Sequence, residues 1–191
     1  MAKFGETLYK GGAFMEEGKL VHMTLNGIKR AVSKYGTFPM FQHGGYVMED
    51  ATFHFNDSAS PQAISDLEKK LGVTFPNDYK EFLLQHNGME MFDGVEILSL
   101  EGITEYNEVQ DFPEGYVLIG YHYDGRYVID TNKSKNGLGY MLYLDSIDDI
   151  EDAVDLDSNF EIWFDMLVSS NGTKYWEVSP NIQEYYKLVS E

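Results

Sequence analysis

Residues 64–88 of the chain read ISDLEKKLGVTFPNDYKEFLLQHNG and predict two short helices joined by a tight link. Ile64, Leu67 and Leu71 have the i, i+3, i+7 spacing of one apolar helix face. Gly72 follows at once, and glycine ends helices because it accepts the left-handed backbone conformation of the C-terminal cap. The first helix is therefore expected to end at this glycine.

The ends of the two helices carry their own signals. Ser60 is a typical N-cap, and Pro61 suits the first helical position because that position needs no backbone N–H donor. Pro76 is expected to begin the second helix in the same way, with Asp78 in its electropositive first turn. One face of the second helix is formed by Tyr79, Phe82, Leu83 and His86.

Downstream of residue 88 the apolar pattern changes to the alternation that is typical of strands. We expect strands over residues 95–100, 116–121, 127–130 and 140–144. The dipeptide Asp124-Gly125 suits a two-residue hairpin turn between the second and third of these strands.

The flanking segments complete the predicted order of elements. A helix is expected to begin at Thr24, and residues 46–55 are expected to form a strand. Ser158 and Glu161 have the spacing of a capping box at the start of a last helix. Helices, then strands, then a helix indicate an α+β fold with a mostly antiparallel, curved sheet flanked by helices.

The helix pair resembles the signature of the SUKH superfamily, which includes SMI/KNR-type cell-wall-assembly regulators and many bacterial immunity proteins. Phe75 stands where that family usually has leucine. The resemblance covers residues 24–176, and it divides the chain into an N-terminal extension, 1–23, and a SUKH-like domain, 24–191. The residues that carry the resemblance are Ile64, Leu67, Glu68, Leu71, Gly72, Val73, Phe75, Pro76, Asp78, Tyr79, Phe82, Leu83, Asn87 and Gly88, followed by Ile119-Gly120, Asp124-Gly125, Ile129-Asp130-Thr131 and 160–167.

The resemblance implies a single α+β domain that binds another protein without catalysis. In bacteria, such domains typically bind the C-terminal effector domain of a secreted polymorphic toxin inside the producing cell and block it. Many of those effectors are nucleases. The matched positions are largely core and capping positions, so the resemblance carries the fold across and assigns no toxin-contacting residue.

Composition narrows the classes of partner. The chain has 14 basic and 32 acidic residues, a net charge of −18 with neutral histidine, and no cysteine. Residues 1–57 carry six basic and six acidic side chains, so the whole excess lies in residues 58–191. Binding to nucleic acid or to an anionic membrane requires Lys and Arg, so this balance argues against both and favours a cationic partner.

The remaining composition signals concern compartment and chemistry. Without cysteine, the chain can form neither disulfides nor thiolate metal sites. It contains no apolar run of about 20 residues that would span a bilayer. The N-terminus lacks the pattern of a signal peptide, and we expect a cytoplasmic protein.

The segment from Asp145 to Asp165 contains nine acidic residues and no basic one. We predict that its first part forms an acidic surface that attracts and binds a basic partner. A solvated face without a partner explains the same pattern, and this alternative stays open. The residues predicted to bind the partner are Asp145, Asp148, Asp149, Glu151, Asp152, Asp155 and Asp157.

Aromatic residues around the predicted hairpin offer a second kind of contact. Tyr121, Tyr123 and Tyr127 are candidate aromatic anchors, because exposed tyrosines often supply the short-range energy of an interface. Packing against the sheet is the alternative role for each of them.

Metal and catalytic motifs receive little support. Residues 155–159 begin like a calcium loop, but Phe160 and Met166 stand where that loop needs glycine and glutamate. His122 and Asp124 flank the hairpin tip and could bind a metal only with a third ligand. The sequence contains no nucleophile elbow, no Walker loop and no dinucleotide fingerprint. We therefore predict no catalytic residue, no metal and no cofactor.

Three functions remain for the structure to address. The first is an immunity or antitoxin-type protein that binds and neutralises a cognate, basic toxin domain. The second is a regulatory scaffold that binds a host protein in cell-wall synthesis or signalling. The third is a hydrolase or small-ligand protein, which would need a concave site with converging polar groups.

Overall fold

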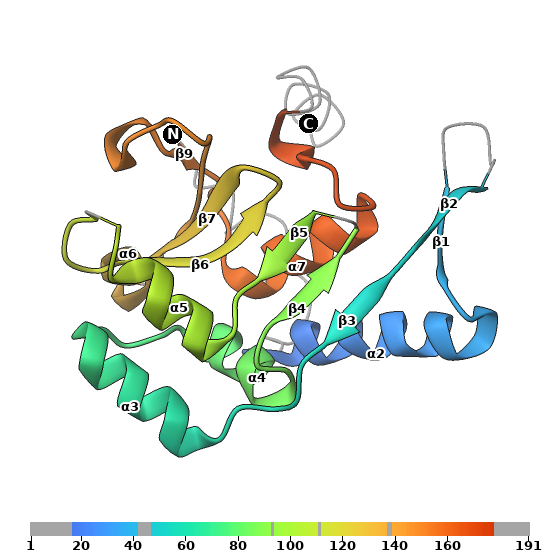
Figure 1. Cartoon of the computed structure of the whole chain (residues 1–191), viewed down its shortest axis with the longest axis horizontal. Helices are drawn as coiled ribbons and strands as arrows, with labels where there is room; N and C mark the ends of the chain where they lie inside the picture. Colours follow the sequence, from blue (N-terminus) through green and yellow to red (C-terminus); the bar gives the residue numbers. More distant parts are fainter. Residues whose placement is uncertain (1–16, 42–46, 93, 111, 137–138, 178–191) are drawn as a thin grey trace, which may run out of the picture.

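The chain folds into an antiparallel sheet with helices on both of its faces (Figure 1). The computed structural model describes residues 17–41, 47–92, 94–110, 112–136 and 139–177, and for residues 39–41 and 47–50 it describes the backbone alone. In chain order the elements are α2 (Lys19–Tyr35), β1 (Phe38–Phe41), β2 (Val47–Ala51), β3 (Phe53–Phe55), α3 (Pro61–Leu71), α4 (Asn77–Gln85), β4 (Met89–Met91), β5 (Val95–Ile97), α5 (Leu100–Asn107), β6 (Tyr116–His122), β7 (Gly125–Asp130), α6 (Thr131–Lys135), β8 (Met141–Leu144), η1 (Ile150–Asp152), β9 (Val154–Asp155), α7 (Phe160–Ser169) and η2 (Tyr175–Glu177).

The sheet is a simple meander. Its seven strands lie in the order β3-β4-β5-β6-β7-β8-β9, and each pairs antiparallel with the next one along the chain. Strands β1 and β2 form a separate two-stranded hairpin. The predicted α+β class, with an antiparallel sheet flanked by helices, is confirmed.

The helices are divided unequally between the two faces. Helices α2, α4 and α7 pack against one another, while α5 packs on β6 and on α3. Figure 1 shows α5 in front of the sheet and α7 behind it. Among the described residues, no helix combines the length and the apolar character that crossing a bilayer requires.

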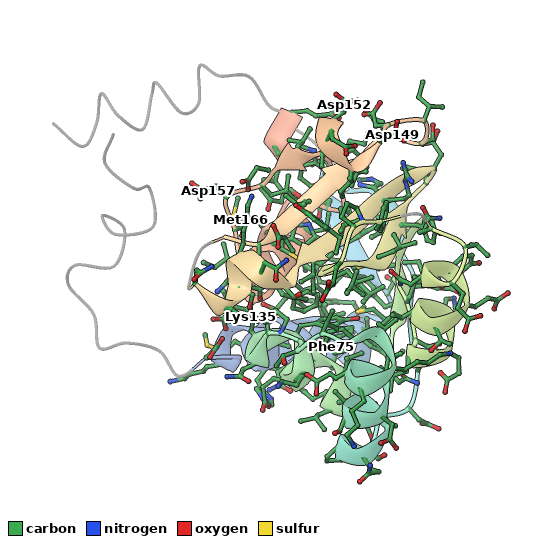
Figure 2. The ribbon with its side chains drawn as sticks, turned by 90° about the vertical axis from the view of Figure 1, so that its left-hand side faces the viewer. Phe75, Lys135, Asp149, Asp152, Asp157 and Met166 are labelled. Carbon is green, nitrogen blue, oxygen red and sulfur yellow. The ribbon has the colours of Figure 1, made fainter. Side chains whose placement is uncertain are left out.

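The predicted helix pair is present as α3 and α4. The Ser60 hydroxyl accepts a hydrogen bond from the Ala63 N–H at 3.1 Å, Pro61 is the first helical residue, and Gly72 ends α3 with a φ of 70°. Phe75 is buried with its ring 5.4 Å from that of Tyr79, so phenylalanine fills this core position (Figure 2).

Two predicted helix starts are wrong, each because the cap differs from the expected one. Helix α2 begins at Lys19, five residues before Thr24, and α7 begins at Phe160 with Asn159 as its cap. The Glu161 carboxylate does not close a capping box with Ser158. It accepts hydrogen bonds from the backbone N–H groups of Gly18 and Leu20 at 3.1 Å each, and so caps the remote helix α2.

Helix α2 crosses the predicted boundary between residues 23 and 24. Val21 and Leu25 on this helix are fully buried. Thr24 lies inside the helix, where its hydroxyl donates to Asp165 of α7 at 2.7 Å. The division into an extension, 1–23, and a domain, 24–191, stays a prediction, and residues 1–16 lie outside the described part of the chain.

Several strand boundaries also differ from the prediction. The strand expected over 95–100 ends at Ile97, because Ser99 caps α5 by accepting from the Gly102 N–H at 3.1 Å. The segment 46–55 contains two strands, β2 and β3, and residue 46 lies outside the described residues. The predicted two-residue turn exists but consists of Tyr123 and Asp124, since His122 pairs with Gly125.

Asp78 connects three elements inside the core. Its side chain is fully buried, its Oδ2 accepts the Glu161 N–H at the start of α7 at 3.0 Å, and its Oδ1 accepts the Tyr140 hydroxyl. The same hydroxyl accepts the Phe160 N–H at 3.0 Å. Burial raises the pKa of Asp78, and the hydrogen bonds from Tyr140, Glu161 and Tyr79 oppose that rise.

Removing this carboxylate should destabilise the whole fold. Asp78→Ala leaves a buried hydroxyl and a buried N–H without their acceptor, and we expect the free energy of unfolding to fall by about 3 kcal/mol or more. Asp66→Ala on α3 is the matched control, because Asp66 is exposed and, among the described residues, pairs with Gln62 and Lys69 alone. We therefore expect a change within about 0.5 kcal/mol. Urea unfolding followed by circular dichroism measures both variants, and equal small losses would contradict a central role for Asp78.

Candidate functional site: an acidic segment beside a sheet groove

The acidic segment predicted from the sequence connects β8 to α7. Six of its seven predicted binding residues are exposed, and Asp148 is half-buried. Figure 2 shows Asp149 and Asp152 close to one another at one end of the molecule, whereas Asp157 lies nearer to Met166 of α7. The structure therefore places most of these carboxylates at the surface. Asp149 and Asp152 lie in one part of it, and Asp157 lies in another, near α7.

Two of the seven carboxylates are neutralised by lysines. Asp145 pairs with Lys174 at 3.2 Å, and Asp155 pairs with Lys133 at 2.5 Å. Hydrogen bonds from Lys174 and Tyr143 lower the pKa of Asp145. Within the described part of the chain, the other five carboxylates have no ion pair: Asp148, Asp149, Glu151, Asp152 and Asp157.

Arg126 on β7 fixes the first part of the segment by its backbone. One guanidinium nitrogen donates to the carbonyl oxygens of Asp145 and Asp148 at 3.0 and 2.5 Å, and the other donates to the Gln110 side chain at 3.1 Å. Because this cation is bound to carbonyl groups, it holds the loop without pairing with the carboxylates. The role of Arg126 is not predictable from the sequence, since nothing local shows what an arginine on a strand will contact.

Replacing Arg126 should loosen the segment. Lysine cannot reproduce the planar fork of donors, so Arg126→Lys should free the two carbonyl groups. We expect amide hydrogen exchange in residues 145–152 to become at least about tenfold faster, while the exchange of α4 changes little. Lys133→Gln is the control, because it removes a surface pair with Asp155 and leaves the arginine contacts in place. Equal exchange in Arg126→Lys and the unchanged protein would contradict the anchoring role.

The three candidate aromatic anchors have different environments. Tyr127 is fully buried, and its hydroxyl bonds to His122 Nδ1 at 2.7 Å, so its assignment as an exposed anchor is wrong. The reason is that its side chain points to the face covered by α7, where its ring lies 4.6 Å from Trp163. Tyr121 is half-buried on the other face, and Tyr123 is 68% exposed at the hairpin tip. Both remain candidate contacts.

Tyr121 and Tyr123 line a groove that the sequence analysis did not locate. It has a volume of about 520 Å³ and is lined by residues of β3, β4, β5, β6 and α5, among others. The third function considered from the sequence required a concave site with converging polar groups, and this groove is one. Its lining residues are Thr52, His54, Glu90, Met91, Gly94, Val95, Glu96, Tyr106, Tyr121 and Tyr123.

The groove floor follows one row of the sheet. In the register of the paired strands, His54 lies opposite Glu90, Glu90 opposite Glu96, and Glu96 opposite Tyr121. Burial and the negative charge of Glu90 raise the pKa of Glu96. Burial also raises the pKa of Tyr121. The alternation in Met89-Glu90-Met91 and Val95-Glu96-Ile97, with a glutamate between two apolar residues, could have indicated such a face. Only the register shows that the two glutamates meet.

The residues of the two candidate metal sites, at the hairpin tip and at 155–159, make other contacts in the structure. His122 is buried, and burial lowers its pKa, while its Nδ1 is engaged with Tyr127. Asp155 is bound by Lys133 and accepts the Asp157 N–H at 2.9 Å. In the portion of the chain that the structure describes, no three His, Asp or Glu side chains gather as metal ligands do.

The pKa values of Glu96 and Glu101 are shifted in opposite directions, so the two residues should affect stability oppositely as the pH changes. The raised pKa of Glu96 means that its contribution to stability is present below the unfolded pKa and is lost as the pH rises through the folded value. Glu96→Gln should therefore raise the melting temperature at pH 7.5 relative to the unchanged protein, and this gain should disappear near pH 4.

Glu101→Gln is the matched control. The pKa of Glu101 is lowered by hydrogen bonds from its own backbone N–H, Asn87 and Ser99. Its contribution is present above the unfolded pKa, so Glu101→Gln should lower the melting temperature at pH 7.5 and lose that effect in acid. Calorimetry at both pH values decides the matter, and the same sign for both variants would contradict the assignment.

Comparison with known proteins agrees with the fold. The sequence model of the SMI1/KNR4 family (SUKH-1) matches residues 58–166. The chain is 91% identical over 144 residues to the uncharacterized protein YnaB of Bacillus subtilis, an alignment that covers 75% of this chain and 100% of that protein. It is 29% identical over 177 residues to the uncharacterized protein YobM of the same organism, covering 82% of this chain and 91% of that protein.

Proposed function

Because the chain belongs to the SMI1/KNR4 family (SUKH-1), which suggests an immunity-type or related function, we propose that it binds and neutralises a cognate polymorphic toxin domain. The proposed partner is a basic domain, for example a nuclease, and the proposed place of action is the cytoplasm of the producing cell. The protein would act stoichiometrically, as a binding protein without catalysis.

The acidic segment is the observation that carries this proposal. Asp149, Glu151 and Asp152 are exposed, and they have no ion pair among the described residues. An acidic surface of this kind attracts a basic protein over long range and raises its association rate. The contacts of Arg126 support a binding role for the segment. Arg126 holds the loop through backbone carbonyl groups, so the side-chain carboxylates stay available to a partner.

Reversing these charges should weaken binding to the toxin. We expect the triple variant Asp149→Lys, Glu151→Lys, Asp152→Lys to lower the association rate by at least about tenfold at low salt and to leave the melting temperature nearly unchanged. The matched control changes Asp57, Asp66 and Glu114 to Lys, which alters the net charge by the same amount on exposed residues elsewhere. Stopped-flow association in low and high salt measures both.

Two results would contradict the role of the segment. One is an association rate that does not respond to salt up to several hundred millimolar, since the attraction between exposed charges is screened under those conditions. The other is an equal loss in the control variant, which would indicate net charge in place of a defined surface.

The partner itself is identified by a pull-down from the native host at low and at moderate salt. Recovery of one basic toxin fragment at a one-to-one ratio, together with rescue of cells that express it, is the expected result. Recovery of a wall-synthesis or signalling protein would instead support the regulatory scaffold. A protein that rescues no cell from any toxin of its host would lose the immunity assignment.

A further inference from the structure

The sheet groove has a chemical character that its position explains. On the face opposite α2, α4 and α7, helix α5 packs on β6 and leaves the ends of β4 and β5 uncovered. The exposed face there carries Glu90 and Glu96 from adjacent strands, at directly opposite positions. Like charges opposite one another on a sheet destabilise it, so the fold tolerates this pair at a cost.

The described residues do not supply a cation to this pair. Each of the seven ion pairs in the described part of the chain lies elsewhere, and none includes Glu90 or Glu96. His54 lies directly opposite Glu90 in the same row, and no ion pair joins these two among the described residues. The nearest lysine or arginine along the row is Arg126, opposite Tyr121. Its guanidinium is already bound to Gln110 and to the carbonyl groups of Asp145 and Asp148.

Three tyrosines line the same groove as the two carboxylates. The rings of Tyr106 on α5 and Tyr121 on β6 meet edge to face with their centroids 5.3 Å apart. Tyr123 also lines the groove, and its ring lies over Gly94, where a Cβ atom would approach the ring to 2.5 Å. Aromatic faces next to carboxylates form the kind of site that binds a guanidinium or an ammonium group.

The Tyr123 ring is held in place by its backbone. Its N–H donates to the Gly94 carbonyl at 2.6 Å, and its φ is 55°, a conformation that glycine adopts much more readily than tyrosine. The chain therefore has tyrosine at a turn position where glycine would be less strained. A tyrosine at such a position fits a role for its ring in binding.

We propose that this groove binds one arginine or lysine side chain of the partner, with Glu90 and Glu96 pairing with the cation and the tyrosines enclosing it. The proposal rests on the proposed function only in that the partner is a basic protein. The acidic segment would bring the partner to this end of the sheet, and the groove would supply the short-range contact.

The test uses a small probe, so that it needs no toxin. The full chain, labelled with ¹⁵N, is titrated with the peptide acetyl-Gly-Arg-Gly-amide and with its citrulline counterpart, which is neutral and nearly isosteric. We expect the arginine peptide to shift the amide signals of Gly94, Glu96 and Tyr121, and the citrulline peptide to bind at least about fivefold more weakly.

Matched charge removals separate the groove from the acidic segment. Glu90→Gln with Glu96→Gln and Asp149→Asn with Asp152→Asn each remove two negative charges. We expect the groove pair to weaken peptide binding at least about fivefold and the segment pair to weaken it less than about twofold. Equal losses, equal binding of the citrulline peptide, or shifts confined to other surfaces would overturn the proposal.

A further variant guards against simple unfolding. Tyr123→Gly relieves the strained turn, so its melting temperature should be unchanged or higher, while its affinity for the arginine peptide should fall at least about threefold. Unchanged affinity would remove Tyr123 from the site. Peptide binding that appears only after deletion of residues 178–191 would assign the groove to the chain's own C-terminal segment and overturn the proposal.

The outcomes for the groove and for the proposed function are distinguishable. A toxin that binds through the acidic segment while the arginine peptide fails to reach the groove would leave the immunity function standing and remove the groove. Peptide binding in the groove without any toxin in the pull-down would support the groove and count against the immunity function.

Discussion

The buried carboxylate of Asp78 is the constraint on which the arrangement of the helices depends. A carboxylate taken out of water needs hydrogen-bond donors, and Asp78 obtains them from the Tyr140 hydroxyl, the Glu161 N–H and its own neighbour Tyr79. These bonds fix the first turn of α7 against α4 and against the residue that precedes β8. The consequence extends further, because Glu161, once positioned, caps α2 through Gly18 and Leu20. One buried acid thus orients α7 directly and α2 through it.

The sequence predicts those features that a few neighbouring residues determine. Ser60 and Gly72 bound α3 as expected, because an N-cap and a left-handed C-cap are local hydrogen-bond patterns. The start of α2 could not be predicted in this way, whereas the start of α7 depends on a local cap, Asn159, one residue after the expected Ser158. Helix α2 takes its cap from a residue more than 140 positions away, and Glu161 matched a capping box that it does not form. Local capping rules fail where tertiary structure supplies a better donor or acceptor.

The candidate site shows the same division between local and remote information. Exposure of the acidic segment was predictable, since a run of carboxylates cannot be buried without partners. The lysine partners of Asp145 and Asp155 were not, because Lys174 and Lys133 lie on other elements. The local sequence does not show which of Tyr123 and Tyr127 is buried. Their positions on the sheet decide it, since Tyr127 lies in the core and Tyr123 is exposed. The groove depends wholly on register, since a shift by one residue would turn Glu90 and Glu96 to the opposite face.

That register also explains why the acidic segment and the groove lie at the same end of the sheet. Arg126 lies opposite Tyr121 of the groove on one side and opposite Leu144, the last residue before the acidic segment, on the other. Arg126 thus connects the groove and the acidic segment. Its strand, β7, pairs with β6, which lines the groove, and its guanidinium donates to the carbonyl groups of the acidic segment. Exposed charges act over about 8–10 Å before salt screens them, whereas a cation enclosed by rings and carboxylates is held by contact. An interface built on this end of the sheet would therefore have a salt-dependent association rate and a dissociation rate set mainly by the groove.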